Sequence, residues 1–143
     1  MRTDRSTILS SSLRPLLPTA FLFSFYLLFA GHNAPGGGFI GGLVAGAGLV
    51  LRQIDQGPES AARMLRVQPR SLLSAGLALT ILTGTAPWIA GRQLLESAKF
   101  EVALPVVGTV KATSALLFDF GIYLIVVGMT ASILATLGSR ESE

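Results

Sequence analysis

The 143-residue sequence contains no cysteine and only one histidine, and these two scarcities exclude several kinds of chemistry. Without cysteine the chain can form no disulfide, no thiolate metal site and no cysteine nucleophile. His32 cannot build a metal site or a serine–histidine pair by itself. We therefore expect that the chain is not an enzyme and that it binds no metal or other cofactor.

Charge is also scarce over long parts of the sequence. The chain has eleven Lys and Arg and eight Asp and Glu, yet residues 15–51, 71–91 and 112–139 together contain a single charge, that of Asp119. A soluble domain carries charge on every element because each has a face in water. This segregation excludes an ordinary soluble fold.

The lengths of these segments predict an all-α membrane protein with four transmembrane helices. About 20 apolar residues cross a hydrocarbon core about 30 Å thick, so the first segment has room for two short spans and the others for one each. We expect a single membrane domain, residues 1–143, with the following parts. The helices cover residues 15–31, 37–52, 71–91 and 114–138, joined by a cytoplasmic loop at 52–70 and an extracytoplasmic loop at 92–111.

Proline and side-chain alternation predict details of the ends and loops. Pro18 should lie in the first turn of the first helix, where a missing N–H costs little. In the 52–70 loop, Pro58 and Glu59 indicate the start of a short helix that Pro69 should end. Apolar residues alternate in the 92–111 loop, which predicts a small β-hairpin.

The basic residues indicate how the helices are oriented. Eight Lys and Arg fall in residues 1–14, 52–70 and 140–143, and three fall on the opposite side. Cytoplasmic segments carry the excess of Lys and Arg, so both termini should be cytoplasmic. These residues flank apolar spans and form no patch interleaved with aromatic residues, so we expect no nucleic-acid partner.

Half of the sixteen glycines lie in residues 31–48, which run from the end of the first predicted helix into the second. Gly38, Gly42 and Gly46 recur at i, i+4 and i+8, and Gly37 and Gly41 repeat the pattern one position earlier. Small residues stacked in this way let another helix approach closely, which predicts that the second helix is an interface. The alternative is a backbone exposed to an ion path.

The fourth predicted helix offers a second set of small residues. Gly121 and Gly128 are seven residues apart and therefore lie on one face. Two such seams in four helices indicate a chain that sits among other membrane helices.

Three polar residues are candidates for ion-path or inter-subunit contacts. His32 and Asn33 lie at the break between the first two helices, where they could relay protons or simply cap the next helix. Asp119 lies about 7 Å below the start of the fourth helix. It is either a functional acid with a partner or a near-surface acid stabilised by the helix dipole. Its counter-charge could be Lys111, Arg92 or a group of a neighbouring protein chain.

Two motifs resemble those of a known family. Residues 31–43, GHNAPGGGFIGGL, resemble the signature turn of the B subunits of the multisubunit Mrp-type (Mnh) cation/proton antiporters. Residues 118–128, FDFGIYLIVVG, are similar to a second signature in the last helix of that family. With the four-helix layout, the resemblance covers about residues 15–138. The packing and signature residues are Pro35, Gly36, Gly37, Gly38, Phe39, Gly41, Gly42, Gly46, Gly121 and Gly128.

The resemblance implies a small integral-membrane subunit of a bacterial plasma-membrane complex that exchanges Na⁺ for H⁺ and supports pH homeostasis. Its partners would be the other membrane subunits and the lipid bilayer, and Na⁺ and H⁺ would be transported ions and not cofactors. The chain would contribute to assembly and is a candidate for part of the ion path. The alternative is an autonomous homo-oligomeric channel or scaffold, although the scarcity of polar residues in the spans argues against a channel.

Overall fold

Four long helices dominate the protein. The structure is a computed structural model that describes residues 7–31, 36–57, 60–65, 67–89, 99–104 and 108–140. The elements in these ranges are α1 (Thr7–Ala30), α2 (Gly37–Gln56), α3 (Ser60–Leu65), α4 (Pro69–Ile89), β1 (Lys99–Leu104), β2 (Gly108–Thr113) and α5 (Ser114–Arg140). In α1, α2, α4 and α5 the helix is long and apolar enough to cross a membrane, which confirms the predicted all-α class with four spans.

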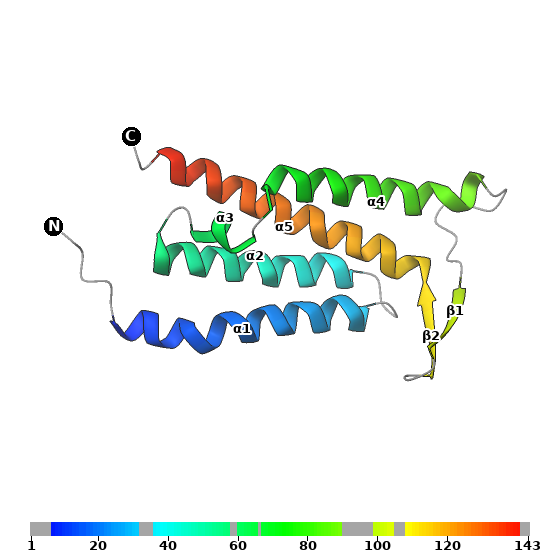
Figure 1. The fold of residues 1–143 in the computed structure, drawn as a ribbon, viewed down its shortest axis with the longest axis horizontal. Helices are drawn as coiled ribbons and strands as arrows, with labels where there is room; N and C mark the ends of the chain where they lie inside the picture. Colours follow the sequence, from blue (N-terminus) through cyan, green and yellow to red (C-terminus); the bar gives the residue numbers. More distant parts are fainter. Residues whose placement is uncertain are drawn as a thin grey trace.

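The long helices lie in a row in the order α1, α2, α5, α4 (Figure 1). Helix α1 begins and α5 ends at the same end of this bundle, as four consecutive spans require. The short helix α3 lies toward that end and contacts α2 and α5, whereas the two strands lie at the opposite end. The cytoplasmic location of the end that holds α3 stays a prediction from the positive charges.

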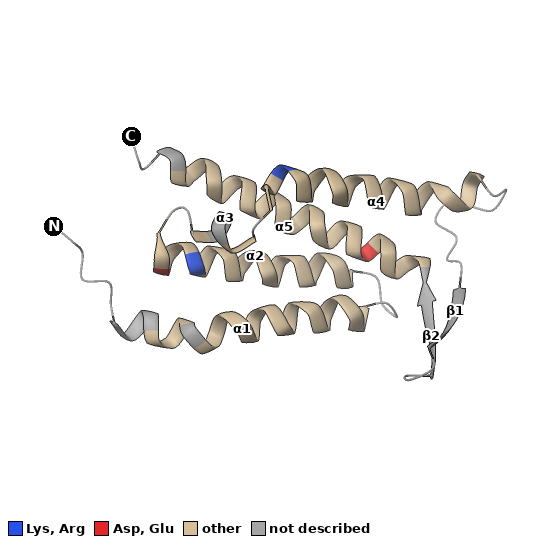
Figure 2. Cartoon of the chain, viewed as in Figure 1, with Lys and Arg blue, Asp and Glu red and all other residues tan. Residues whose placement is uncertain are grey.

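The structure describes the side chains of four charged residues, and all but one of them lie near the ends of the long helices (Figure 2). Arg52 and Asp55 belong to the last turns of α2, and Arg70 belongs to the first turn of α4. These three lie at the end of the bundle that holds α3. The exception is Asp119, which lies within the candidate span of α5.

Helix α1 begins at Thr7, well before the predicted start at residue 15, and Pro15 and Pro18 both lie inside it. The predicted helix start at residue 15 was therefore wrong, as was the placement of Pro18 in the first turn. The predicted start relied on charge alone and ignored the apolar residues before it, but Leu13 and Leu17 are only 3% and 6% exposed. Because residues four apart share a helix face, burial of this pair favours continuing the helix back toward the N-terminus.

Helix α2 runs to Gln56, beyond the predicted end at residue 52. Gly57 ends it with a φ of 96°, a backbone conformation that favours glycine. The Gly57 N–H donates to the Gln53 carbonyl at 2.9 Å. The prediction ended the helix where charge begins, but backbone hydrogen bonds continue past a membrane border. At its other end the helix follows Gly36, whose φ is 109°.

The connection between α2 and α4 contains the short helix α3. The Ser60 hydroxyl, at its start, lies 2.7 Å from the Gly57 carbonyl and 3.1 Å from the Arg52 carbonyl, so α3 is tied to the end of α2. The predicted start at Pro58 and Glu59 lies outside the described residues. Pro69 does not end α3, which stops at Leu65, but begins α4, where a proline loses no intrahelical bond.

Part of the loop for which alternation predicted a hairpin forms two antiparallel strands. In β1 and β2, Lys99 pairs with Thr113 and Val102 pairs with Val110. Helix α5 follows β2 directly at Ser114. The extracytoplasmic location of these strands stays a prediction.

The hydrophobic core lies where α1, α2 and α5 meet. Its buried residues come from these three helices, and Phe21 of α1 and Leu65 of α3 pack against its edge. They are Leu28, Ala45, Leu49, Tyr123, Val127, Ala131 and Leu134. The share of each span that is buried falls from 44% in α2 to 11% in α4, so α2 is the most buried of the four long helices and α4 the most exposed.

The glycines of α2 determine how closely it packs on α5. A Cβ at Gly42 would lie 2.8 Å from the Cβ of Val126, and one at Gly46 would lie 2.9 Å from the Thr130 hydroxyl oxygen. Neither contact leaves room for a larger side chain. Lipid tails are as apolar as the side chains, so this close packing stabilises the helix pair where the hydrophobic effect does not.

The neighbouring face of α2 approaches α1 in the same way. A Cβ at Gly41 would lie 2.8 Å from the Ser24 carbonyl oxygen, and one at Gly48 would lie 3.4 Å from the Phe21 ring. We expected the glycine repeat of this helix to receive a partner helix. The structure supplies two, α1 and α5 of the same chain.

The small residues of α5 also contact the same chain. A Cβ at Gly128 would lie 2.8 Å from the Leu73 N and 3.1 Å from the Pro69 carbonyl oxygen, both in α4. Gly121 faces Gly76, and a Cβ there would lie 3.0 Å from the Gly76 carbonyl oxygen. Both predicted seams therefore face helices of this chain in the structure.

Gly42→Leu should destabilise the bundle by about 1–3 kcal/mol, because an enlarged side chain forces α2 away from Val126. The measurement is thermal unfolding of the purified chain in detergent. Ala47→Leu is the matched control, because Ala47 lies on the exposed face of the same helix. Equal melting temperatures for the two variants would contradict close packing at Gly42.

Candidate functional site

Asp119 is a buried acid of α5 that lies beside the start of α2. It is 8% exposed, and the Gly38 backbone N–H hydrogen-bonds its carboxylate. Gly38 is the second residue of α2, and an N–H in the first turn has no acceptor within its own helix. The start of α2 therefore offers Asp119 a donor and the positive end of a helix dipole.

Gly38 must be glycine for this approach. A Cβ there would overlap the backbone carbonyl group of Asp119. The partner of the acid is thus a backbone group of its own chain. Lys111 and Arg92, considered as counter-charges, have side chains outside the described part of the structure.

A second polar cluster joins three helices at the centre of the bundle. The Ser24 hydroxyl of α1 donates to the Gly41 carbonyl of α2 at 2.8 Å, and it lies 2.9 Å from the Tyr123 hydroxyl of α5. A serine has one hydroxyl proton, and here a carbonyl accepts it. Tyr123 must then donate to the Ser24 oxygen. Ser24 is fully buried and Tyr123 is 6% exposed, so this chain of bonds satisfies polar groups that lipid could not.

Two aromatic rings hold the Tyr123 ring in place. Phe25 of α1 stacks on it with ring centroids 5.9 Å apart, and Phe120 of α5 stacks at 6.4 Å. Both separations lie in the favourable range for offset aromatic pairs. The hydroxyl is therefore aimed at Ser24 by packing as well as by hydrogen bonding.

Most other hydroxyls of the described spans bond to the turn before them. Each donates to the carbonyl four residues earlier at 2.7–2.9 Å, so it is satisfied within its own helix. These residues are Thr80, Thr83, Thr85, Thr130, Ser132 and Thr136. This pattern leaves few polar groups to line an aqueous path.

The α3 end of the bundle holds two incompletely bonded polar side chains. Gln53 donates from Nε2 to the Leu134 carbonyl at 3.3 Å, which links α2 to α5. Its Oε1 is buried without a hydrogen-bond partner in the described part, as is Nε of Arg52. No group of three or more His, Cys, Asp and Glu in the described ranges could hold a metal ion.

The structure describes only some of the remaining predicted site residues. His32, Asn33 and Pro35 lie outside the described residues. Phe39 is 50% exposed and so lies away from the buried glycine faces of α2. The ion-path or inter-subunit roles suggested for the first two residues stay predictions.

No role was predicted from the sequence for Ser24 or Tyr123. The signal that could have found them was a hydroxyl in the middle of an aromatic, apolar span, since a polar atom at membrane depth needs a partner. Its partner could not be inferred, because Tyr123 is 99 residues away in sequence.

These observations define a multi-pass α-helical membrane protein whose buried polar groups bond mainly to backbone and to one another. Its sequence matches, over residues 8–132, the family described as the domain related to the MnhB subunit of Na⁺/H⁺ antiporter. The chain belongs to this family. Together with its four spans, this membership places it in the membrane of a bacterium.

Relatives of known name cover most of the chain. It is 40% identical over 120 residues to the B subunit of the Na⁺/H⁺ antiporter of Bacillus subtilis, with 84% of each chain covered. It is 37% identical over 119 residues to the B subunit of the Na⁺/H⁺ antiporter of Alkalihalophilus pseudofirmus, with 83% of each covered. A probable K⁺/H⁺ antiporter protein of Rhizobium meliloti, named as an A/B subunit, is 34% identical over 90% of this chain but only 13% of that protein.

A solved structure shows the same fold. The chain resembles part of a chain in the Mrp complex from Dietzia sp. DQ12-45-1b, with a TM-score of 0.77 and 35% identity. The match covers 94% of this chain and 14% of that one. The four-helix unit is therefore similar to one segment of a much longer chain of that complex.

Ser24→Ala and Tyr123→Phe should each destabilise the chain, and the double variant should cost less than their sum. The coupling energy should be about 0.6 kcal/mol, because hydrogen bonds between membrane helices are modest. Unfolding in detergent measures it. Tyr26→Phe is the control, because Tyr26 is 65% exposed and should change little. Strictly additive effects would show that the two hydroxyls do not interact.

Proposed function

We propose that the chain is the small B-type membrane subunit of a multisubunit bacterial antiporter that exchanges Na⁺ or another monovalent cation for H⁺. The observation that carries this proposal is the 40% identity to an antiporter B subunit over 84% of both chains. The structural match to a segment of an Mrp complex supports it independently. We propose no catalytic role for the chain.

The exposed faces of the bundle fit a protein that contacts lipid and other membrane subunits. Only 11% of the span in α4 is buried, and Leu77, Ile81 and Leu82 of this helix are 49–65% exposed. Helix α1 similarly exposes its aromatic residues, among them Phe23 and Phe29. A row of four helices with both outer helices so exposed has ample surface for neighbours.

The buried polar groups support a role in assembly over an ion path of the chain's own. Ser24 and Tyr123 bond to each other, and most other described hydroxyls in the spans bond to their own helix. Conduction needs binding groups that an ion can enter and leave. The main ion path would then be formed by other subunits of the complex.

The fused relative supports the choice of partners. In the Rhizobium meliloti A/B protein, the segment similar to this chain is 13% of the whole. A segment that is fused in one organism and separate in another commonly occupies the same place in an assembly. We therefore propose that this chain packs against a large membrane subunit through lipid-depth apolar contacts.

We propose a structural role for Asp119, in which its carboxylate fixes the first turn of α2. The hydrogen bond from Gly38 and the close approach of the two backbones support this role. An acid so placed is held by a helix start and needs no cation from a neighbouring chain.

Deleting the gene for this chain should abolish cation/proton exchange in inverted membrane vesicles while the other subunits are still produced. The reason is that the complex would lose one of its packed membrane segments. Restoring the chain from a plasmid is the control. Full exchange activity in the deletion strain would contradict the proposal.

Asp119→Asn should keep both the assembled complex and its exchange activity, because the amide oxygen can still accept from the Gly38 N–H. Asp119→Leu should reduce the amount of assembled complex, since it leaves that N–H unpaired in a buried place. Native gels and vesicle exchange assays measure the two effects. Loss of exchange in an intact Asp119→Asn complex would instead assign the acid to the ion path.

The alternative function, an autonomous homo-oligomeric channel, predicts a different result. The purified chain alone would then conduct ions when reconstituted in liposomes. The internal bonding of the hydroxyls in the described spans predicts that no conductance above that of empty liposomes is observed.

A further inference from the structure

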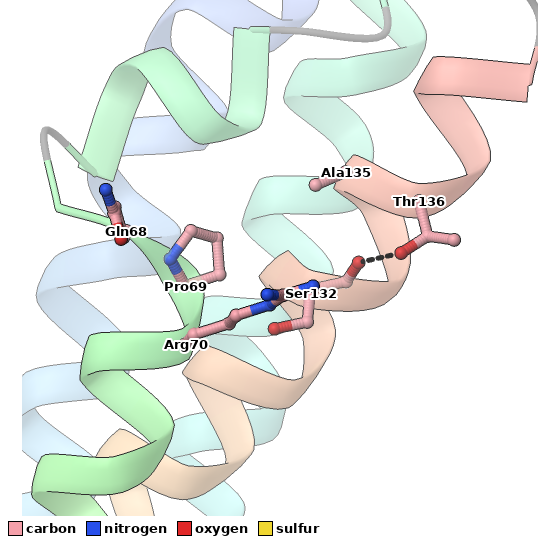
Figure 3. Close-up of a pocket in the computed structure, with 6 residues that line it drawn as sticks. All are labelled: Gln68, Pro69, Arg70, Ser132, Ala135 and Thr136. Carbon is pink, nitrogen blue, oxygen red and sulfur yellow. Dashed lines mark hydrogen bonds between the residues drawn. The ribbon is translucent and has the colours of Figure 1, made fainter.

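A cavity with several polar side chains in its lining lies between the first turn of α4 and the last turns of α5 (Figure 3). Its volume is about 410 Å³. The residues that line it are Gln68, Pro69, Arg70, Ser132, Ala135 and Thr136. Five of these six described residues carry no charge and the sixth, Arg70, is a cation, so this part of the lining has a net positive charge.

Arg70 is the group in this cavity with unused binding capacity. Its side chain extends from α4 toward Ser132 of α5 (Figure 3), and it is exposed. The Ser132 hydroxyl donates to the Gly128 carbonyl, and the Thr136 hydroxyl donates to the Ser132 carbonyl. Both lining hydroxyls thus direct their protons to backbone groups, and none of the described residues that line the cavity is a carboxylate that could neutralise the guanidinium. Arginine presents a planar set of donors that matches the oxygens of a phosphate.

The depth of the cavity suggests what kind of phosphate it meets. Pro69 and Arg70 begin the candidate span of α4, and the candidate span of α5 ends at Gly138, so the cavity lies at one membrane border. This is the end of the bundle that the excess of Lys and Arg assigns to the cytoplasm. The cytoplasmic leaflet carries anionic lipids, and basic pockets between helices on this side bind their headgroups.

An exposed apolar surface continues from the cavity toward the membrane centre. Leu77 lies seven residues after Arg70, on the same face of α4 two turns deeper, and is 49% exposed. Met129 lies about one turn deeper than Ser132 on α5 and is 56% exposed. A cavity that contains a cation and continues into an apolar strip matches a phospholipid, whereas free phosphate would use only the cavity.

We propose that this cavity binds the headgroup phosphate of an anionic phospholipid, with Arg70 as its principal ligand and an acyl chain along Leu77 and Met129. The site lies on the α4–α5 pair, on the far side of α5 from the contact with α2. Lipid binding here does not depend on the exchange activity of the complex.

The test is lipid binding to the purified full-length chain, measured by native mass spectrometry during titration with phosphatidylglycerol or phosphatidylcholine. The wild-type chain should bind phosphatidylglycerol more tightly. Arg70→Gln should weaken phosphatidylglycerol binding about fivefold, from the loss of one cation near the headgroup, and should leave phosphatidylcholine binding unchanged. Arg70→Lys should bind phosphatidylglycerol with an affinity between those of the wild type and Arg70→Gln, because lysine keeps the charge but not the planar set of donors.

Two further variants separate a built cavity from general surface charge. Arg52→Gln removes an arginine at the same end of the bundle but outside this cavity, and it should leave the lipid preference within about twofold of wild type. Ala135→Phe fills the cavity with the charge intact and should weaken phosphatidylglycerol binding as well. Ala135 and Arg70 are both exposed, so neither change disturbs the core.

The proposal is overturned if Arg70→Gln binds phosphatidylglycerol like wild type. It is also overturned if Arg52→Gln weakens binding as much, or if Ala135→Phe has no effect, because either result means diffuse attraction to surface charge. Displacement of the lipid by a modest excess of inorganic phosphate would identify a free-phosphate site instead, which also contradicts it.

Discussion

The close approach of α2 to both α1 and α5 is the constraint on which the rest of the structure depends. Glycine at positions 38, 41, 42 and 46 removes the side chains that would otherwise hold these helices apart. In a membrane, where apolar surface gains little by being buried, such backbone proximity is a main source of helix association. The bundle is therefore organised around the helix with the smallest side chains.

Both polar clusters are consequences of this proximity. Ser24 reaches the Gly41 carbonyl because no Cβ intervenes at Gly41, and the same contact brings Tyr123 within 2.9 Å of the serine. At the start of α2, Gly38 allows the first turn of the helix to meet Asp119. The chain thus satisfies these buried polar groups internally, and its outer faces remain apolar and can meet lipid or other subunits.

The sequence alone was sufficient for the class of fold, because charge segregation reports membrane spans directly. The sequence prediction misplaced the start of α1 and the end of α2, because helices continue past the membrane border. Helix α1 begins earlier, where Leu13 is buried, and α2 continues until Gly57 ends it. The glycine repeat predicted close helix packing but not which helix is packed. That identity depends on long-range contacts, as between Gly46 and Thr130, that no local pattern contains.

The candidate site, too, was predictable only in part from the sequence. A lone acid in an apolar span is conspicuous, so Asp119 was identified, but its partner was sought among charged side chains, whereas the structure supplies a backbone N–H, which has no residue-specific signature.

The absence of cysteine permits a direct test of the central claim, that the glycine face of α2 packs within its own chain. A Cβ at Gly46 would lie 3.4 Å from the Thr130 Cβ, close to the spacing of a disulfide, so Gly46→Cys/Thr130→Cys places two thiols within bonding reach. Oxidation in native membranes should then give an intrachain cross-link, and Ala47→Cys/Thr130→Cys should give none. Cross-links that form only between chains would contradict the account, because they would place another chain on the glycine face.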